Sequence, residues 1–325
     1  MTRIILRALA IVGALFAALI FVGWLAFIPS PQSAGYRFVQ TWGEKGEGPG
    51  QFNNPIGIAV SKTEVFVADS RNARIQVFDF NGNFKRAFGT RGKNPGQLGR
   101  PMNMTIAVDE LYVADYWNDR IEVFALDGSP LRSIGHAGSG PGAFSAPGGV
   151  AVAHTGDLYV ADFYNQRVQQ LRDDGTFVRQ WGKTGKKGWR AGAFNYPTDV
   201  ALGADGTLYI ADGYNDRVQV FHPDGTFSHK WGGPFAININ GPFNKWFRTV
   251  SSIAVGQGGK VFATDFYNDR VQVFTSNGTF LTAIGAKGTG PGQFTYPLGV
   301  AVADDGTVFV VDFGNNRIQK WKPAE

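Results

Sequence analysis

The sequence repeats one short pattern six times, and this repetition constrains the fold more than any other feature. The clearest copy is TDFYNDRVQVF, at Thr264–Phe274. Every copy has an Asp, an Asn three residues later, an Arg two residues after that, and then Ile or Val. Successive copies lie 46 to 53 residues apart. A period of this length is typical of repeat architectures.

Each copy has the pattern of a β-hairpin. Alternating residues precede the Asp, as in Leu158–Ala161, and follow the Arg, as in Val271–Phe274. The residues between them leave Asp and Arg opposite each other across the turn, where a charge-assisted pair forms. Because a catalytic site needs one constellation and not six, the pattern indicates a scaffold. The predicted structural pairs are Asp69 with Arg74, Asp115 with Arg120, Asp162 with Arg167, Asp212 with Arg217, Asp265 with Arg270, and Asp312 with Arg317.

The segments around each hairpin complete a four-stranded unit. A glycine-rich loop and a short strand precede it, as in Gly43–Val60, and an Asn-Gly or Asp-Gly turn leads to a fourth strand. The sixth unit ends at Trp321 after its third strand, and the missing strand stands at the start of the chain, at Gly35–Gly43. We therefore predict an all-β, six-bladed propeller of four-stranded antiparallel blades over residues 36–322. The N-terminal strand completes the last blade and removes an open sheet edge.

Residues 1–28 are predicted to form a cytoplasmic tip and one transmembrane signal-anchor helix, followed by a linker at residues 29–35. Ala8–Ile28 holds 21 residues without a charge, and at about 1.5 Å per residue it matches the hydrocarbon core of a bilayer. No good signal-cleavage site follows. Arg3 and Arg7 precede the apolar run, which predicts a cytoplasmic N-terminus. We expect a single-pass membrane protein whose propeller is extracytoplasmic, and periplasmic in a bacterium.

The pattern Ala-Asp-x-x-Asn-x-Arg-Ile-Gln-Val-Phe, with Gly-x-Gly-x-x-x-x-Pro upstream, resembles the NHL repeat over Tyr36–Trp321. The resemblance implies a six-bladed propeller. It implies less about activity, because NHL propellers include RNA-binding and protein-binding domains of tripartite-motif ubiquitin ligases, peptidyl-hydroxyglycine lyases and bacterial surface proteins.

Composition and motifs argue against several kinds of chemistry. The chain has no Cys, so it has no disulfide, thiolate nucleophile or Cys-based metal site. The lyase-type NHL enzymes hold zinc with several channel histidines, whereas the four histidines here are predicted on separate parts of the blades, at His136, His154, His222 and His229. No Gly-x-Ser-x-Gly, phosphate loop or His-Glu-x-x-His occurs. The net charge of +5 is no argument for nucleic acid.

Function is expected where the repeats differ, since the shared residues build the scaffold. The hairpin turns carry aromatic residues, and the two unusual inter-blade loops, Gly182–Pro197 and Gly232–Ser252, interleave aromatic and basic residues. The alternative is that these rings pack beneath the glycine-rich loops and that the basic loop is merely solvated. The predicted binding residues of this loop-bearing face are Trp117, Tyr164, Lys186, Lys187, Trp189, Arg190, Tyr214, Trp246, Phe247, Arg248 and Tyr267.

The inner strands also differ at one position. Three units have Gly57, Gly149 and Gly299, and the others are aligned with Thr105, Asp199 and Ser252, with Asn103 nearby. We predict that these four polar residues line the channel. Their oxygens suit a hard cation such as Ca²⁺, but a full site takes six or more oxygens. No cofactor or metal is therefore predicted, and Ca²⁺ stays an open alternative.

The sequence favours a ligand-binding or protein-binding scaffold without chemistry of its own. Its expected partners are the membrane, through the N-terminal helix, and a protein or a small anionic or aromatic ligand on the loop-bearing face. A first alternative is a metal-dependent hydrolase or lyase with a site near Asp199. A second alternative is RNA binding, which the predicted orientation of the anchor disfavours.

Overall fold

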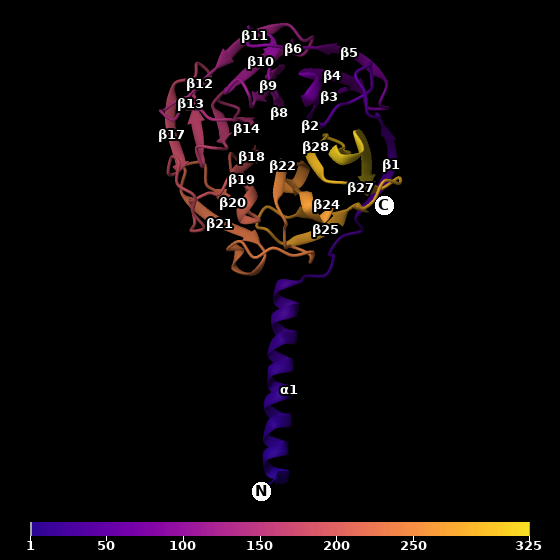
Figure 1. The fold of residues 1–325 in the computed structure, drawn as a ribbon, viewed down its shortest axis with the longest axis vertical. Coiled ribbons are helices and arrows are strands. Elements are labelled where there is room, and N and C mark those ends of the chain that lie inside the picture. The colour runs from indigo at the N-terminus through magenta and orange to yellow at the C-terminus, as the bar shows by residue number, and fades with distance from the viewer. Residues whose placement is uncertain (1, 325) are drawn as a thin grey trace.

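Six blades surround a central channel (Figure 1), in a computed structural model that describes residues 2–324. The side chains of residues 2–6, 8, 20 and 24–27 are not described. Each blade is a four-stranded antiparallel sheet, and the predicted six-bladed all-β propeller is confirmed. Blade 1 consists of β2 (Pro55–Val60), β3 (Glu64–Asp69), β4 (Arg74–Asp79) and β5 (Phe84–Phe88). Blade 2 consists of β8 (Pro101–Ala107), β9 (Glu110–Asp115), β10 (Arg120–Ala125) and β11 (Pro130–Ile134). Blade 3 consists of β14 (Pro147–Val152), β15 (Leu158–Asp162), β16 (Arg167–Leu171) and β17 (Phe177–Gly182). Blade 4 consists of β18 (Pro197–Leu202), β19 (Leu208–Asp212), β20 (Arg217–Phe221) and β21 (Phe227–Gly232). Blade 5 consists of β22 (Val250–Val255), β23 (Val261–Asp265), β24 (Arg270–Phe274) and β25 (Phe280–Ile284). Blade 6 consists of β28 (Pro297–Val302), β29 (Val308–Asp312), β30 (Arg317–Pro323) and β1 (Tyr36–Trp42).

The last blade takes its outer strand from the start of the chain. Its sheet has the order β1-β30-β29-β28, and Figure 1 shows β1 running beside the C-terminus. Tyr36 pairs with Pro323 and Trp42 pairs with Ile318. This pairing covers an edge of β30 that would otherwise offer unpaired N–H and C=O groups.

Short elements shape the loops between and within blades. Two-residue strands pair in parallel as β6 (Thr90–Arg91) with β7 (Gln97–Leu98), β12 (His136–Ala137) with β13 (Ala143–Phe144), and β26 (Ala286–Lys287) with β27 (Gln293–Phe294). Single 3₁₀ turns are η1 (Ser70–Asn72), η2 (Gly213–Asn215), η3 (Pro234–Ala236), η4 (Gln257–Gly259), η5 (Phe266–Asn268) and η6 (Phe313–Asn315). Turns η1, η2, η5 and η6 follow the repeated Asp directly, and each is followed by a residue in the left-handed conformation.

The repeated polar residues form a buried cradle in each blade, shown most completely in blade 4. Asp212 accepts hydrogen bonds from Arg217 Nε at 2.8 Å, Asn215 Nδ2 at 2.9 Å and Gln219 Nε2 at 3.0 Å. It also accepts the backbone N–H of Asn195, on the loop that enters the blade. The guanidinium of Arg217, which is fully buried, donates in addition to carbonyl groups of that loop. The cradle therefore fastens the loop to the hairpin and satisfies the buried carboxylate.

The Asp–Arg pair recurs with one exception. In blades 1, 3, 4, 5 and 6 the Arg Nε atom lies 2.7 to 2.9 Å from the Asp oxygen. In blade 2 Arg120 Nε is 4.0 Å from Asp115 and 3.0 Å from Glu122. Glu122 occupies the position that Gln219 holds in blade 4, and the second carboxylate draws the guanidinium away from Asp115.

A second polar contact ties neighbouring blades together. The left-handed residue that ends the hairpin turn accepts the backbone N–H of the residue that precedes the next inner strand. In each bond a backbone N–H donates to a side-chain oxygen of the preceding blade. The pairs, donor first, are Ala146 and Asp119, Tyr196 and Gln166, Thr249 and Asp216, Tyr296 and Asp269, and Asn54 and Asn316. The joint between blades 1 and 2 has Ala73 at this position, and the N–H of Arg100 bonds instead to Asp115 of its own blade.

Six hydrophobic clusters of the described residues fill the spaces between adjacent blades. The cluster between blades 1 and 2, for example, contains the buried side chains of Phe66, Leu98 and Phe124. Because each blade is apolar on both faces, it gains its stability mainly from its two neighbours. The ring is a rigid frame that leaves the loops and the channel free to differ.

The N-terminal helix and linker precede the ring. Helix α1 (Thr2–Phe27) extends away from the blades (Figure 1). Leu281 O accepts the N–H groups of Gln32 and Ser33, so the linker lies along β25. Within the part of the chain that the structure describes, no helix combines the length and apolar character needed to cross a membrane. The predicted transmembrane anchor thus gains no support; Met1 and the side chain of Arg3, which belong to that prediction, lie outside the described residues.

Candidate functional site

The central channel contains two cavities that share Asn103. One, here called the vestibule, has a volume of about 200 Å³. It lies among the first residues of the inner strands and the hairpin turns. The residues that line it are Ile56, Arg100, Met102, Asn103, Tyr116, Gly148, Phe163, Thr198, Tyr214, Thr249, Ser251, Phe266, Tyr267 and Leu298. The other, here called the chamber, has a volume of about 280 Å³ and is lined by the second halves of the inner strands. The vestibule therefore lies on the face that carries the inter-blade loops.

The aromatic side chains of the vestibule come from one recurring place, the turn after the buried Asp. Tyr116 and Phe163 follow Asp115 and Asp162 directly. Since the cradle fixes each Asp, it also fixes the residues of the turn beside the channel. Burial raises the pKa of Tyr116 and of Tyr214, so both phenols are neutral hydrogen-bonding groups near neutral pH.

Two residues that the sequence did not single out support this aromatic lining from beside the cavity. Tyr196 stacks on Phe163 with ring centroids 4.7 Å apart, and Tyr296 stacks on Phe266 at 5.1 Å. Both stand directly before the proline that begins an inner strand and have a positive φ, of 52° and 55°. An aromatic residue immediately before that proline, in only two of the six units, was the signal available in the sequence.

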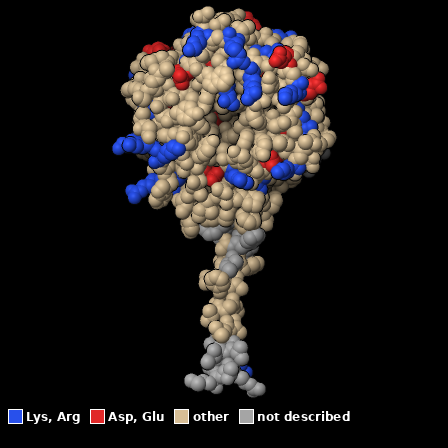
Figure 2. All heavy atoms as spheres, in the orientation of Figure 1, with Lys and Arg blue, Asp and Glu red and all other residues tan. Residues whose placement is uncertain are grey.

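Cationic side chains lie against the aromatic rings of this face. Arg100 is 5.5 Å from the ring centre of Tyr116 and 5.7 Å from that of Trp117. Lys187 Nζ is 4.1 Å from the ring centre of Tyr196, and Arg248 is 5.3 Å from that of Tyr267. Figure 2 shows Lys and Arg side chains gathered over blades 1 and 2 and again at the edge where blades 3 and 4 meet.

The structure brings together part of the predicted binding set. Tyr214 and Tyr267 line the vestibule, and Trp117, Tyr164, Lys187 and Arg248 lie beside it through the ring and cation contacts. Lys186 is exposed, and the exposed Trp189 and Arg190 contact each other at 5.9 Å and do not line the cavity. The rings of Trp117, Tyr164, Tyr214 and Tyr267 are about half exposed, which leaves their faces available to a ligand.

The loop Gly232–Ser252 behaves differently from the prediction. Phe247 is fully buried and packs on Phe274 at 5.6 Å, so its assignment to a binding surface is wrong. It is the blade-5 equivalent of Phe194, another buried ring at the end of an inter-blade loop. Trp246 is half-buried and contacts Phe243 edge-on at 5.1 Å. The loop therefore covers Phe247 and part of Trp246, as the alternative held, whereas its Phe235 is 71% exposed.

The inner-strand alignment made from the sequence needs one correction. Met104, Val150 and Val200 occupy equivalent positions of their sheets, opposite Val113, Val160 and Ile210. The residue at the glycine position in blade 2 is therefore Asn103, and Thr105 lies two residues further on. All four predicted channel residues nevertheless line the chamber.

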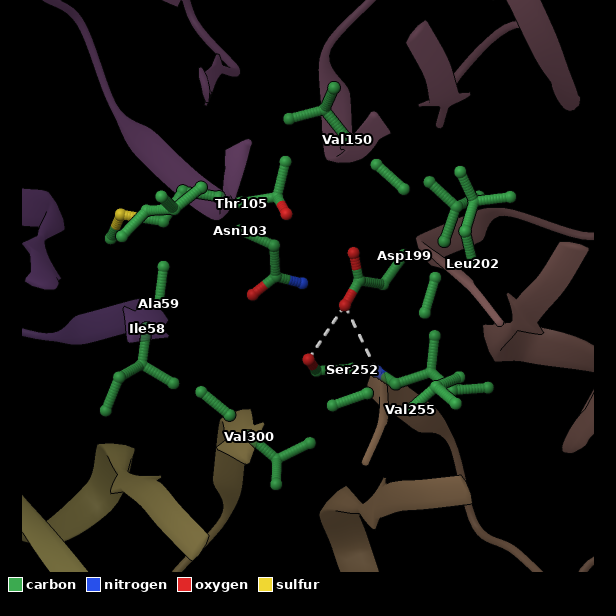
Figure 3. Close-up of a pocket in the computed structure, with 18 of the residues that line it drawn as sticks. Ile58, Ala59, Asn103, Thr105, Val150, Asp199, Leu202, Ser252, Val255 and Val300 are labelled. Atoms are coloured by element: carbon green, nitrogen blue, oxygen red, sulfur yellow. Dashed lines mark hydrogen bonds between the residues drawn. The ribbon is translucent and has the colours of Figure 1, made fainter. Parts of the chain in front are cut away.

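Asp199 is the one ionisable residue among those that line the chamber. Its Oδ2 atom accepts the hydroxyl of Ser252 at 2.7 Å and the N–H of Ile253 at 3.1 Å, and Figure 3 shows both bonds. Burial raises the pKa of Asp199 to about 7, while these hydrogen bonds act to lower it. The carboxyl group is thus poised to gain or lose a proton near neutral pH.

The described residues offer few side-chain groups that could bind a metal ion. Among the described residues, no three His, Cys, Asp or Glu side chains form a group that could hold a metal ion. The chamber offers side-chain oxygens from Asn103, Thr105, Asp199 and Ser252, fewer than a calcium site usually takes.

Comparisons with known families agree with this architecture. The NHL repeat family matches residues 52–78, 144–171 and 194–221. A family described as 6-bladed beta-propeller matches residues 246–322. A search among curated proteins found no match.

Solved structures show the same fold at low sequence identity. A streptogramin B lyase is 14% identical with a TM-score of 0.60, over 90% of this chain and 99% of that one. A protein of unknown function from Bacteroides thetaiotaomicron is 15% identical with a TM-score of 0.67, over 88% and 75%. A chain of a nidogen/laminin complex is 16% identical with a TM-score of 0.54, over 70% and 79%. At these identities the likeness concerns the fold alone.

Proposed function

We propose that this chain, an NHL-repeat six-bladed β-propeller, is a binding scaffold whose vestibule takes an aromatic, anionic group of a small ligand or of a partner protein. The observation that carries the proposal is the lining of the vestibule. It combines Tyr116, Phe163, Tyr214, Phe266 and Tyr267 with the guanidinium of Arg100 in one cavity.

The chemistry of the vestibule suits such a group. A flat ring gains contact area against half-exposed aromatic faces, and each well-packed aromatic pair contributes about 0.5–1.5 kcal/mol beyond burial. An anionic substituent is attracted by Arg100, Lys187 and Arg248, which stand on the aromatic rim. The rigid ring of blades holds these residues in place before binding, which lowers the entropic cost.

The experiment uses 1-anilinonaphthalene-8-sulfonate, an aromatic anion, as the probe. We expect saturable binding to the folded protein, weakened in Arg100→Ala and Tyr267→Ala by about 5- to 30-fold, as expected for about 1–2 kcal/mol per lost contact. Arg132→Ala is the matched control, because Arg132 also lies over a tyrosine, Tyr112 at 5.6 Å, but on the outer part of blade 2. Equal affinity for all four proteins would contradict the proposal.

Partner identity needs a second measurement. Chemical crosslinking in cells, followed by mass spectrometry, would compare the unaltered protein with Arg100→Ala/Tyr267→Ala. Neighbours that bind through the vestibule are expected to disappear from the variant. A neighbour set that does not change would place the partner surface elsewhere.

A hydrolase or lyase with a site near Asp199 is a second candidate. One observation favours it: a buried carboxyl group whose pKa is about 7 is suited to general acid or base catalysis near neutral pH. The fold likeness to streptogramin B lyase is compatible with such a role. Metal analysis of the purified protein, and loss of the bound metal in Asp199→Ala, would support the metal-dependent form; a metal-free protein would remove it.

RNA binding and cellular location are separate proposals from the sequence. A flat titration with single-stranded RNA would remove the RNA alternative. The extracytoplasmic location depended on the N-terminal anchor, and it stays a prediction. Protease accessibility decides it: an extracytoplasmic propeller is degraded by protease added to spheroplasts, whereas a cytoplasmic one is protected.

A further inference from the structure

The chamber is a second cavity, different in character from the vestibule. The last residues of five inner strands line it, at Val60, Val152, Leu202, Val255 and Val302, which places it toward the face opposite the inter-blade loops. Figure 3 shows aliphatic side chains around its circumference, whereas Asp199, Asn103 and Ser252 come from different strands and point toward its middle. The chamber is therefore ringed by aliphatic side chains, and its polar side chains converge toward the axis of the channel.

Asp199 is held rigidly in the chamber. It is 4% exposed, and Ser252 and Ile253 both donate to its Oδ2 atom. A Cβ built on Gly149 would lie 2.0 Å from Oδ1, so the glycine of blade 3 makes the room that the carboxyl group occupies. From the opposite side the amide of Asn103 points toward Asp199 (Figure 3).

The charge of Asp199 has no counter-ion in the chamber. Every other residue that lines the cavity, on all six inner strands, is non-ionisable. The cation associated with the channel, Arg100, lines the vestibule and not the chamber. A buried carboxylate is costly without a positive partner; accordingly burial moves the pKa of Asp199 to about 7. A positively charged ligand would provide the counter-ion for Asp199 that the chamber lacks.

We propose that the chamber binds a primary ammonium group on a short aliphatic chain, with the Asp199 carboxylate as its counter-ion. An ammonium group has three donors, and Asp199, Asn103 and Ser252 provide acceptors that face one another near the channel axis. The valine, leucine and isoleucine side chains around the rest of the cavity take the methylene groups, at about 0.8 kcal/mol per buried CH₂. A divalent metal fits less well, because the four oxygen-bearing side chains of the lining include a single carboxylate. This proposal does not depend on the vestibule.

Binding is then coupled to the release of a proton. Aliphatic amines stay protonated between pH 5 and pH 8, whereas Asp199 is mostly ionised at pH 8 and mostly protonated at pH 5. The ligand must displace that proton at the lower pH. The expected Kd is therefore about 100-fold higher at pH 5 than at pH 8.

The test is isothermal titration calorimetry with n-butylamine hydrochloride on the full chain, at several pH values. We expect saturable one-to-one binding with the stated pH dependence and no binding of n-butanol, which has the same chain without the charge. Asp199→Asn should abolish the binding. Asp205→Asn is the matched control, since it removes a carboxylate from the turn that follows the same strand, and it should bind as the unaltered protein does.

Ser252→Ala keeps the inference testable if Asp199→Asn fails to fold. Loss of one donor to Asp199 should raise the pH at which binding reaches half its maximum, with binding retained at high pH. Binding of n-butylamine that is independent of pH, that persists in folded Asp199→Asn or that is matched by n-butanol would overturn the proposal. Absence of binding at millimolar n-butylamine, or tight stoichiometric binding of Ca²⁺ in its place, would overturn it as well. Probe binding in the vestibule should be unchanged by Asp199→Asn, so the two proposals can fail separately.

Discussion

Asn316 accepts a hydrogen bond from the backbone N–H of Asn54 at 2.9 Å, across the joint between the last blade and the first. The two residues are 262 positions apart in the sequence. The ring is thus closed twice, near the loop-bearing face by this bond and at its circumference by β1 on β30. Four other joints between blades have the equivalent hydrogen bond. The joint that closes the ring therefore uses the same bond as the joints between consecutive blades.

Asn316→Ala should lower the free energy of unfolding by about 1–2 kcal/mol, because the N–H of Asn54 loses its partner at a half-buried site. Denaturant unfolding measures the change. Asn83→Ala is the control: Asn83 bonds to Asp79 at an exposed turn, and its loss should cost much less. Equal stability of the two variants would show that the inter-blade bond is energetically unimportant.

Arg217→Ala should lower the free energy of unfolding by about 3–5 kcal/mol, because it leaves the buried carboxylate of Asp212 without its cation. The reduced stability appears as a lower midpoint in urea. Arg172→Ala removes an exposed arginine from the turn that follows β16 and should change the midpoint little. A similar small effect for Arg217→Ala would contradict the structural role of the cradle.

A chain that begins at Gly43 should melt on the order of 10 °C below a chain that begins at Pro29. The shorter chain lacks β1, and with it the contact of Phe38 with Trp321 and the pairing with β30. The chain from Pro29 keeps that strand and the linker contacts with Leu281, and a third chain that begins at Tyr36 lacks those contacts and so isolates the effect of β1. Thermal melts followed by circular dichroism give all three values, and coincident melts would mean that β1 does not close the ring.

The stability difference between the protein and Asp199→Asn should depend on pH. The folded-state pKa of Asp199, about 7, lies above its unfolded value. The folded protein therefore binds the extra proton between about pH 4 and pH 7, and its stability relative to the variant falls as pH rises through this range. The expected slope is about 1.4 kcal/mol per pH unit, with no further change above pH 8. Urea midpoints at pH 4.5, 6 and 8 measure it; a difference that does not vary with pH would place the carboxyl group in contact with solvent.

The sequence established the architecture because the architecture is built from local signals used six times. The Asp–Asn–Arg spacing marks each hairpin, and the truncated sixth unit, ending at Trp321, required the strand at the start of the chain to complete it. Such signals act between residues close in the chain, so they need no knowledge of the folded structure. The weaker pair of Arg120 in blade 2 also has a local cause, the nearby Glu122.

Tertiary structure decided what occupies the channel and its mouth. Ring closure brought Asn103, Asp199 and Ser252 of three blades into one chamber. The placement of Thr105 at the glycine position was a misalignment, since Asn103, like Gly57, stands two residues after the first proline of its strand.

Phe247 is core because it fills the space between blades 4 and 5, at the position that Phe194 holds one blade earlier. Tyr196 lies beside the vestibule because its ring stacks on Phe163 across a blade boundary.

The proton affinity of Asp199 likewise depends on burial among strands from several blades, far apart in sequence. Repeated residues specify the frame through local geometry. The residues that differ between repeats gain their shifted pKa values and ring contacts only when the closed ring brings six strands, distant in sequence, around one axis. Burial and ring stacking depend on neighbours from other blades, and those neighbours exist only in the folded protein.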